Sequence, residues 1–293
     1  MMCLFLLVMS LIMIILESMI RIEKLKDTKP YLHFADKNEI ESYYKEIMKN
    51  GENVFGIYFD STVVGISYIE DDDDPYLYVY IFPMYRRKGY GYQAVKTIEK
   101  SFKTSPLKTI NTSYDMNNKA SNEFAQKCGY KMTWASTLMS YKGDKFDIPK
   151  LPVRNYEDND FDNVYYFVDK AFHLMRLSTG WFPDSKLKEP NEETRKWYSD
   201  SKKDSYVYII NNQIVGYVNL EEDEINVVAI KNEEQGKGYG RLLTEYATNI
   251  VIDRGYKEVT LWCVVNNKKA RNLYDSLGFK EVFVEAFAEK KNI

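Results

Sequence analysis

Apolar residues along the chain recur with two different spacings, which predict both helices and strands. Around residue 245 they return every three or four positions, as on the buried face of a helix. The residues in question are Leu242, Leu243, Tyr246 and Ile250, and the same spacing occurs at Val95, Ile98 and Phe102. The nearly unbroken apolar run at 259–265 is instead typical of a buried strand. The sequence therefore predicts a mixed α/β protein.

Two pairs of strand-like segments are separated by short polar turns, which predicts two β-hairpins. The turns are Asp60-Ser61 and Asn211-Asn212. Each is followed by an apolar pair and a glycine, Val63-Val64-Gly65 in one case and Ile214-Val215-Gly216 in the other. The two hairpins are therefore expected to be equivalent.

Two further motifs recur at one common offset of 149 residues, which indicates an internal duplication. The segment 86–91 recurs at 235–240, and the pairs Asn118-Lys119 and Gly129-Tyr130 recur as Asn267-Lys268 and Gly278-Phe279. Within each copy the predicted order is strand, helix, hairpin strands, strand, glycine-rich turn, helix, strand, helix and strand. The sheet is therefore expected to form twice.

The copies are predicted to meet in the segment 145–152, where Pro149 and Pro152 favour extended backbone. We therefore expect a hydrophobic N-terminal segment at 1–18, a first domain at 19–148 and a second domain at 149–293. The second copy carries 18 additional residues between its first strand and its hairpin. They fall around 175–200 and are rich in aromatic side chains.

The first sixteen residues are apolar except for Ser10, a run slightly short of the roughly 20 residues of a membrane-spanning helix. One interpretation is a membrane anchor with Lys24 and Lys26 on the cytoplasmic side. The other is that translation starts at Met19, the start of a strand-like segment. We favour the second interpretation and expect a cytoplasmic protein, with membrane contact only if residues 1–18 are a real anchor.

Composition narrows the possible functions. Of the 293 residues 45% are hydrophobic and 28% charged, a balance typical of folded domains. The net charge of −3 gives no cationic field for a nucleic-acid partner. Three scattered cysteines and two distant histidines match neither a disulfide framework nor a zinc site. We expect no bound metal.

A strand that runs into a glycine-rich turn and then a helix is a predicted anion site in both copies. Glycines let backbone N–H groups converge, and the helix N-terminus adds partial positive charge. A phosphate-binding loop of the Walker type would need Gly-Lys followed by Ser or Thr, which neither copy has. A dinucleotide fingerprint would need a third glycine where Leu243 stands. The turn alone therefore does not identify its ligand.

The motifs together resemble the GNAT acetyltransferase superfamily. The second copy reads Gln235-x-x-Gly238-x-Gly240 and then Asn267-x-x-Ala270-x-x-Leu273-Tyr274-x-x-x-Gly278-Phe279, and the first copy has Ile81-Phe82-Pro83-Met84-Tyr85-Arg86 before its turn. The likeness covers nearly the whole chain beyond Met19. It implies two tandem domains, each a mixed, largely antiparallel twisted sheet flanked by helices, with acetyl-CoA as cosubstrate. It does not identify the acceptor.

The resemblance also implies which residues hold coenzyme A. The turn would bind the pyrophosphate through backbone amides, and the preceding strand would offer the amides of Val228 and Ile230, with Val228 facing the thioester carbonyl. The residues implied at the turns are Gln235, Gly236, Lys237, Gly238, Tyr239, Gly240 and Arg241 in the second copy and Arg86, Arg87, Lys88, Gly89, Tyr90 and Gly91 in the first. The charges of Lys237 and Arg241 either contribute or are surface cations. Asn267 is either a coenzyme A contact or only a helix N-cap.

Two second-copy residues are the predicted acid and base. Tyr274 matches the family's tyrosine near the coenzyme A sulfur and would protonate the leaving thiolate, its alternative being core packing. Glu224 matches the general-base glutamate of the histone acetyltransferases, although it belongs to an acidic run typical of a turn. Glu222 and water are competing bases. An ungapped alignment puts Ala125 and Pro75 at these positions in the first copy, which we therefore predict to be degenerate.

The predicted function is transfer of an acetyl group from acetyl-CoA to a primary amine of a small molecule or a protein, by direct attack. Acylation of Cys263 is the less favoured route, because a small strand cysteine is typical of a core. The alternatives are a non-catalytic acyl-CoA-binding sensor and a membrane-tethered modifier. Aromatic residues around Trp181 and Trp197 are predicted to shape the acceptor pocket. The acidic run at 221–224 would suit a cationic amine.

Overall fold

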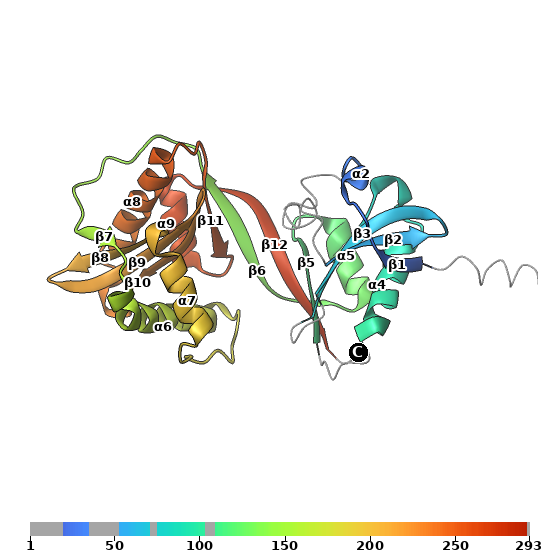
Figure 1. Cartoon of the computed structure of the whole chain (residues 1–293), viewed down its shortest axis with the longest axis horizontal. Coiled ribbons are helices and arrows are strands. Elements are labelled where there is room, and N and C mark those ends of the chain that lie inside the picture. The colour runs from blue at the N-terminus through green and yellow to red at the C-terminus, as the bar shows by residue number, and fades with distance from the viewer. Residues whose placement is uncertain (1–19, 35–52, 71–74, 103–108, 292–293) are drawn as a thin grey trace, which may run out of the picture. The chain divides into compact units, whose positions relative to one another are not determined.

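The computed structural model of the chain describes residues 20–34, 53–70, 75–102 and 109–291 (Figure 1). The N-terminal segment 1–18 lies outside these ranges. Within them, no helix has both the length and the apolar character needed to cross a membrane. The chain divides into two compact units, one of residues 1–133 together with 286–293 and one of residues 134–285.

The first unit begins with an antiparallel run of four strands, to which β5 adds in parallel. Their order continues β1-β2-β3-β4-β5-β12-β6. The elements are β1 (Ile20–Lys24), α2 (Lys29–Leu32), β2 (Val54–Phe59), β3 (Thr62–Glu70), β4 (Tyr76–Ile81), α4 (Tyr90–Ser101), β5 (Thr109–Asp115), α5 (Lys119–Cys128) and β6 (Lys131–Tyr141). The predicted turn at Asp60-Ser61 joins β2 to β3, with Asp60 in the left-handed region.

The second unit repeats this plan in the order β12-β6-β11-β10-β9-β8-β7. Its elements are β7 (Val153–Asn155), α6 (Phe161–Thr179), α7 (Glu192–Asp200), β8 (Ser205–Ile210), β9 (Gln213–Glu221), β10 (Glu224–Ile230), α8 (Tyr239–Asp253), β11 (Val259–Val264), α9 (Lys268–Leu277) and β12 (Lys280–Lys291). The predicted helix around residue 245 and the predicted strand at 259–265 correspond to α8 and β11. The mixed α/β prediction is confirmed for both copies.

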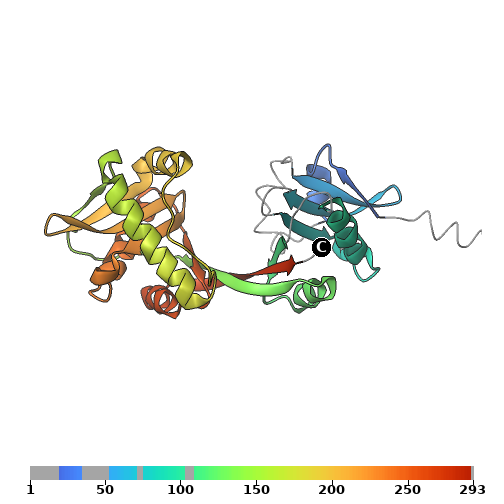
Figure 2. The ribbon, with the colours of Figure 1, turned by 90° about the horizontal axis from the view of Figure 1, so that it is seen from below.

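The final strands of the two copies are exchanged, which the duplication did not predict. In the second unit β11 pairs antiparallel with β6, the last strand of the first copy, from Val259↔Tyr141 to Val264↔Ser136. In the first unit β5 neighbours β12, the last strand of the second copy. Strands β6 and β12 lie side by side (Figures 1 and 2). The compact units therefore do not follow the predicted boundary between residues 148 and 149.

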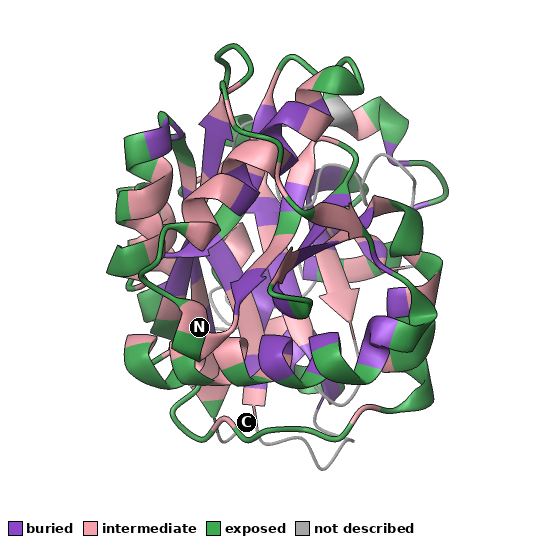
Figure 3. Cartoon of the chain, turned by 90° about the vertical axis from the view of Figure 1, so that its left-hand side faces the viewer, coloured by how far each residue is buried: buried purple, intermediate pink, exposed green. Residues whose placement is uncertain are grey.

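Helices cover both faces of the second unit's sheet. Every second residue of a strand faces the same side of the sheet. On one side, Val218 of β9 and Leu261 of β11 pack in one cluster with Leu243 of α8 and Leu277 of α9. The intervening residues, Tyr217 for example, pack with α6 and α7 in a separate cluster. The burial colouring shows this arrangement, with largely buried strands between helices whose outer turns are exposed (Figure 3). The sheet is therefore the middle of three layers.

The predicted linker at 145–152 is irregular, but it is fixed to α8. Backbone atoms of Phe146 exchange two hydrogen bonds with the side chain of Asn249, at 2.7 and 2.9 Å. Lys145 forms an ion pair with Asp253 at 2.8 Å. Pro149 and Pro152 thus lie in a segment held by side chains rather than in a loose spacer.

A buried ion pair ties the exchanged strand β12 to the core of the first unit. Glu99 on α4 is only 4% exposed, and one of its carboxylate oxygens lies 2.7 Å from Nζ of Lys290. Nζ of Lys290 also donates to the carbonyl of Cys128 at 3.0 Å, and Lys96 contacts the other oxygen of Glu99 at 3.0 Å. Because a buried carboxylate is costly without partners, Lys290 helps to specify that β12 closes this unit.

We expect Lys290→Met to lower the free energy of unfolding of the first unit by about 3 kcal/mol, because it removes one of the two lysines that pair with the buried Glu99. The double variant Glu99→Gln with Lys290→Met should cost less than the single one, since no buried charge is then stranded. Urea unfolding of all four proteins tests this. Additive losses in the double-mutant cycle would contradict it.

Candidate active site

Strands β10 and β11 are parallel but pair at a single position, Glu224↔Thr260, and do not pair beyond it. The other edge of β10 pairs with β9 up to Ile230↔Gly216. The amide N–H of Lys231 donates a hydrogen bond to the carbonyl oxygen of Val215, on the side of β9. Because successive amides alternate along a strand, those of Val228 and Ile230 point to the open side. These are the two amides that the sequence motif implied.

A β-bulge in β10 distinguishes the second copy from the first. The register of β10 against β9 shifts between Ile225 and Val227, so that Asn226 is an extra residue. Strand β4 pairs with β3 without any such shift. The side chain of Asn226 donates to Asn219, 3.1 Å away and opposite the bulge. The bulge is therefore held by a side-chain hydrogen bond from β9.

The bulge also corrects the alignment of the two copies. In the second copy Glu224 pairs with Glu221 on β9 and with Thr260 on β11. The first-copy residues that correspond to these two partners are Glu70 and Asn111. Both of them pair with Tyr76. The first-copy counterpart of Glu224 is therefore Tyr76 and not Pro75, since an ungapped alignment cannot include a bulge. The first copy still has no carboxylate at this position.

The predicted base and acid lie on opposite faces of the sheet. Ile225 packs in the cluster with α8 and α9, so alternation places the neighbouring Glu224 on the α6 and α7 face. Tyr274 on α9 packs on the α8 and α9 face. Four residues of strand, about 13 Å, separate Glu224 from Val228. A proton relay from the reacting centre to Glu224 would therefore need water.

The glycine turn of the second copy has the geometry of an anion cradle. Gly236 and Gly238 have φ of 81° and 88°, in the left-handed region, and space is open where a Cβ would stand on either. No side chain in the described part of the chain caps the N-terminus of α8, and the first turn of this helix contains no acidic residue. The amide N–H groups of this helix end are thus available to an anion.

Side chains around this turn are mostly engaged with one another. Gln235 donates to the carbonyl of Ile230 at 3.2 Å and accepts from Lys269 at 2.9 Å. Lys237 forms an ion pair with Glu234 at 2.8 Å, which raises the pKa of the lysine. Lys269 could not be assigned to this turn from the sequence, because it lies on α9 and reaches the turn only in the folded chain.

The remaining predicted residues brace the turn. Arg241 donates to Oγ of Ser276 on α9 and lies 3.4 Å from Glu245. Tyr239 begins α8 and packs edge-on against Tyr208 at 5.4 Å between ring centroids. Asn267 caps α9 through a 3.3 Å hydrogen bond from the amide of Ala270. A Cβ atom on Gly240 would lie 3.8 Å from the side chains of Ile230 and Leu273.

The ring centroid of Tyr274 lies 6.0 Å from that of Phe279, and Tyr274 packs against the core cluster of the second unit. Burial raises the pKa of the Tyr274 hydroxyl, and the nearby Cys263 raises it further. Burial raises the pKa of Cys263 itself to about 12, so its thiol stays neutral near pH 7. The pair thus offers a proton donor and no thiolate nucleophile.

The first copy keeps the same turn with different side chains. Arg86 donates to the carbonyl of Ile81 at 2.9 Å, the bond that Gln235 makes to Ile230. Arg87 has φ of 63°, an uncommon conformation for a residue with a side chain. Lys88 lies over the ring of Tyr85 at 5.6 Å.

Helix α4 begins after Gly89, whose φ is 85°, and its first residue, Tyr90, stacks near Phe59 with 4.6 Å between ring centroids. A Cβ on Gly91 would lie 3.1 Å from Phe124. The backbone conformation thus favours glycine at 89, and the narrow space beside Phe124 favours it at 91.

A cavity of about 760 Å³ lies in the first unit, a size usual for small-molecule sites. It extends from the turn, including Arg86, Arg87 and Gly89, to the interior side of β5 and α5. Tyr114 and Ala125 line its inner part. The first copy, which the sequence predicts to be degenerate, therefore contains a cavity of ligand size.

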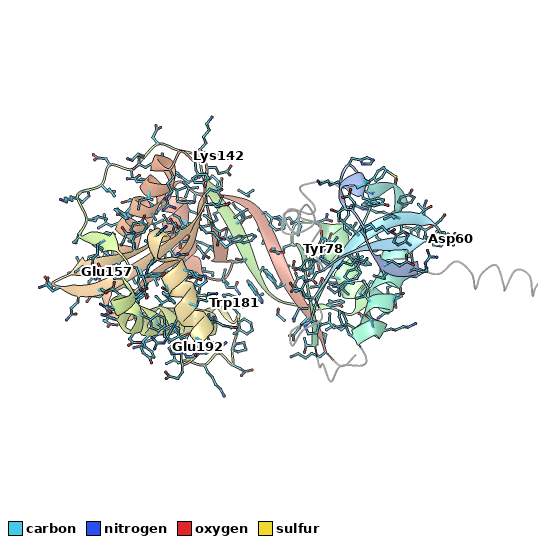
Figure 4. All side chains as sticks on the ribbon, in the orientation of Figure 1. Asp60, Tyr78, Lys142, Glu157, Trp181 and Glu192 are labelled. Atoms are coloured by element: carbon cyan, nitrogen blue, oxygen red, sulfur yellow. The ribbon has the colours of Figure 1, made fainter. Side chains whose placement is uncertain are left out.

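The aromatic residues of the insertion divide between surface and core. Trp181 lies after α6 (Figure 4), and its ring centroid is 4.3 Å from that of Trp134 on β6. The indole N–H of Trp181 is buried and has no hydrogen-bond partner in the described part of the chain. Trp197 is exposed, whereas Tyr198 is buried between α7 and the sheet. Trp134 reaches the insertion through the strand exchange, which no local sequence pattern predicts.

The acidic run forms the turn between β9 and β10. Glu221 pairs with Glu224 across the hairpin, and Glu222 at its tip has φ of 52°. Glu221 and Glu222 are exposed, whereas Glu224 is half-buried. Of these carboxylates, Glu224 is the one that belongs to the strand leading to the candidate site. No cluster of three metal-ligating side chains is present in the described ranges.

Comparison with known proteins identifies the fold. A sequence model described as the Acetyltransferase (GNAT) family matches residues 16–130 and 171–279. A GCN5-related N-acetyltransferase from Sphaerobacter thermophilus superposes over 93% of this chain and 95% of its own, with a TM-score of 0.72 and 16% identity. A tandem GNAT protein from the clavulanic acid biosynthesis pathway covers 93% and 98%, with a TM-score of 0.62 and 12% identity.

A shorter sequence match links the chain to a curated enzyme. Mycothiol acetyltransferase of Rhodococcus jostii is 44% identical over 57 residues, which are 20% of this chain and 19% of the relative. The match thus spans about a fifth of that protein's length. Because the match covers so little of either protein, it does not identify the acceptor of this chain.

Asn219 holds the bulge, and we expect its replacement to lower stability. Its side chain is 2% exposed, donates to Ser205 at 3.0 Å and accepts from Asn226. Asn219→Leu would leave the buried hydroxyl of Ser205 with one partner fewer and should lower the free energy of unfolding by about 1–3 kcal/mol. Asn226→Ala, at an exposed position, should cost at most about 1 kcal/mol. Equal losses measured by urea unfolding would contradict a buried network at the bulge.

Proposed function

Because the chain belongs to the acetyltransferase (GNAT) family, we propose that it transfers an acetyl group from acetyl-CoA to a primary amine, and that the second copy carries out the reaction. The observation that supports the second copy is the bulged, splayed strand β10. Its Glu224 lies on one face of the sheet, and Tyr274 of α9 packs on the other. The first copy has neither the bulge nor the carboxylate.

The residues present fit an acyl thioester of coenzyme A. The converging amides of the turn and of the α8 N-terminus suit a diphosphate, and Lys269 adds a nearby cation. The open edge of β10 suits an extended, amide-bearing chain, since such a chain can pair with the unsatisfied amides of Val228 and Ile230. When bound, the thioester would supply an activated acyl group.

In the proposed reaction each residue has one task. Glu224 accepts, through water, the proton that the acceptor's ammonium group must lose before its nitrogen forms the new C–N bond. The amide of Val228 donates a hydrogen bond to the carbonyl oxygen as negative charge develops there. Tyr274 donates its proton to the departing sulfur as the C–S bond breaks, and solvent returns a proton to Tyr274.

Direct attack is favoured over an acyl-cysteine route. The thiol of Cys263 is 5% exposed and, with a pKa near 12, is neutral at physiological pH. A neutral thiol is a poor nucleophile.

The acceptor is proposed to be an amine that approaches from the α6 and α7 face, as a small molecule or as part of a protein. Trp181 follows α6 and packs against Trp134 of β6, and Glu224 lies on the α6 and α7 face. The buried indole N–H of Trp181 could donate a hydrogen bond to an oxygen atom of the amine substrate.

Tyr274→Phe removes the proposed acid. We expect it to lower kcat by about 10²–10⁴-fold and to leave acetyl-CoA affinity within a few-fold, because only the proton transfer is lost. Thiol release from acetyl-CoA with a broad panel of amines is the assay. Tyr246→Phe removes a half-buried hydroxyl on α8 and should leave kcat unchanged. Loss of binding in Tyr274→Phe would indicate a packing role instead.

Glu224→Gln removes the proposed base, and its signature is in the pH profile. At pH 7 kcat/KM should fall by about 10²-fold or more and then rise with pH, because the amine must lose its proton unaided. The raised pKa of Tyr274 keeps the acid protonated as pH rises, so Tyr274 should cause no loss of rate below about pH 10. Glu222→Gln, in the exposed turn, is the matched control. An unchanged profile for Glu224→Gln would exclude this residue as the base.

A further inference from the structure

Helix α6 of the second unit ends in a turn that carries a positive charge next to the aromatic insertion. We propose that Arg176 in this turn binds a carboxylate of the acceptor. The acceptor is then a small amine that also carries a carboxylate and an apolar side chain, as an apolar amino acid does. The inference rests on the proposed function, because it assigns a substrate class to the amine that the second copy acetylates.

Arg176 differs from the other arginines of the second unit in having no carboxylate beside it. Five of the six arginines in this unit form ion pairs, with N···O distances between 2.6 and 3.4 Å. The five pairs are Arg154–Asp160, Arg195–Asp162, Arg241–Glu245, Arg254–Asp204 and Arg271–Glu281. The guanidinium group of Arg176 forms no hydrogen bond or ion pair with any residue that the structure describes. Its charge is therefore available to a ligand.

Aromatic rings hold the guanidinium group of Arg176 in place. Its central carbon lies 5.9 Å from the ring centroid of Trp181 and 6.0 Å from that of Phe172, one turn earlier on α6. Trp181 (Figure 4) in turn packs against Trp134 of β6. A guanidinium group held against rings loses less conformational freedom when it binds a ligand. Its planar set of N–H donors matches the two oxygens of a carboxylate.

A second hydrogen-bond donor without a partner belongs to the same cluster of rings. The indole N–H of Trp181 is buried and has no partner within the described ranges. A carboxylate accepts several hydrogen bonds at its two oxygens and also carries the charge that balances a guanidinium group. A neutral acceptor group would leave the charge of Arg176 unbalanced. The excess of donors therefore favours an anionic group.

The register of the strands places this cluster near the proposed reacting centre. On β10, Val228 is four residues beyond Glu224, and the parallel register makes it level, to within a residue, with Val264 of β11. On β6, Trp134 is two residues beyond the partner of Val264. The backbones of Trp134 and Val228 are thus roughly 12–15 Å apart, which a small acceptor and the side chains that bind it can span. Met139 of β6 packs with α8 and α9, so alternation places Trp134 on the opposite face, the one that carries Glu224.

Exposed aromatic side chains indicate an apolar part in the same ligand. Phe182 is 53% exposed, and its ring centroid lies 5.5 Å from that of Trp181. Trp262 of β11 is 38% exposed. Its neighbours Leu261 and Cys263 pack with α8 and α9, so Trp262 also belongs to the α6 and α7 face. A ligand with an apolar side chain can cover these rings, while its carboxylate binds Arg176.

Acetylation of matched amines by the full chain tests the proposal. Phenylalanine is compared with phenethylamine, which lacks only the carboxylate, and leucine is compared with 3-methylbutylamine. The wild type should have a kcat/KM about 10- to 100-fold higher for the amino acid of each pair, as expected for hydrogen bonds between charged groups. Arg176→Gln should remove this preference by raising the KM for the amino acids. It should leave the KM for acetyl-CoA and the rates with the two plain amines unchanged.

Two further variants separate recognition of the carboxylate from stability. Arg195→Gln is the matched control, because Arg195 also lies over a ring, that of Phe161 at 4.2 Å, but is paired with Asp162. It should leave the preference for amino acids intact. Arg176→Lys keeps a positive charge in the last turn of α6 but lacks the planar set of donors, so it should retain only part of the preference.

Three results would overturn the proposal. They are equal kcat/KM values within each pair, a raised KM for acetyl-CoA in Arg176→Gln, and a preference for phosphoethanolamine over ethanolamine larger than that for the carboxylates, which would indicate a phosphate instead. Acetylation of the plain amines without any preference would retain the proposed function and remove this inference. Calorimetric titration with phenylalanine covers the opposite case. Binding that Arg176→Gln abolishes, in a chain that acetylates no amine, would retain the carboxylate site and remove the proposed function.

Discussion

The strands on either side of each candidate site are joined at only one residue pair, and the other features of the site depend on this constraint. A strand edge that has no neighbouring strand leaves backbone amides exposed, and such groups are satisfied by water or by a ligand. In the second copy these amides belong to Val228 and Ile230. The glycine turn follows the same strand directly. One local divergence thus produces both an extended binding edge and an anion cradle.

The exchange of final strands makes each unit depend on the sequence of both copies. Strand β12 brings Lys290 to Glu99 in the first unit, and β6 brings Trp134 to Trp181 in the second. Neither unit's sheet is complete without a strand from the other copy's sequence. A duplication of this kind is difficult to separate into independent domains. It also allows the two sites to differ in chemistry while the fold of each is maintained.

Much of the fold could be predicted because it is local. The spacing in α8, the apolar run of β11, the turn at Asn211-Asn212 and the motif around Gly238 each depend on neighbouring residues. What the sequence could not provide is tertiary. The bulge at Asn226 depends on Asn219 across the hairpin, so an ungapped alignment chose Pro75 where Tyr76 stands.

Strand exchange leaves no local signal, and the predicted boundary at 148 and 149 therefore differs from the division of the units. For the candidate site, the positions of the turn and of the Val228 and Ile230 amides followed from the motif. The engagement of Gln235 by Lys269 and the open cavity beside Tyr114 did not.

The most direct test is a crystal structure of the full chain with acetyl-CoA. In the second unit we expect the diphosphate at the turn around Gly238, the pantetheine along the open edge of β10 and the sulfur within hydrogen-bond distance of the Tyr274 hydroxyl. The thioester carbonyl should accept from the amide of Val228. A ligand bound away from the gap between β10 and β11, with Tyr274 still enclosed in the core, would contradict the account.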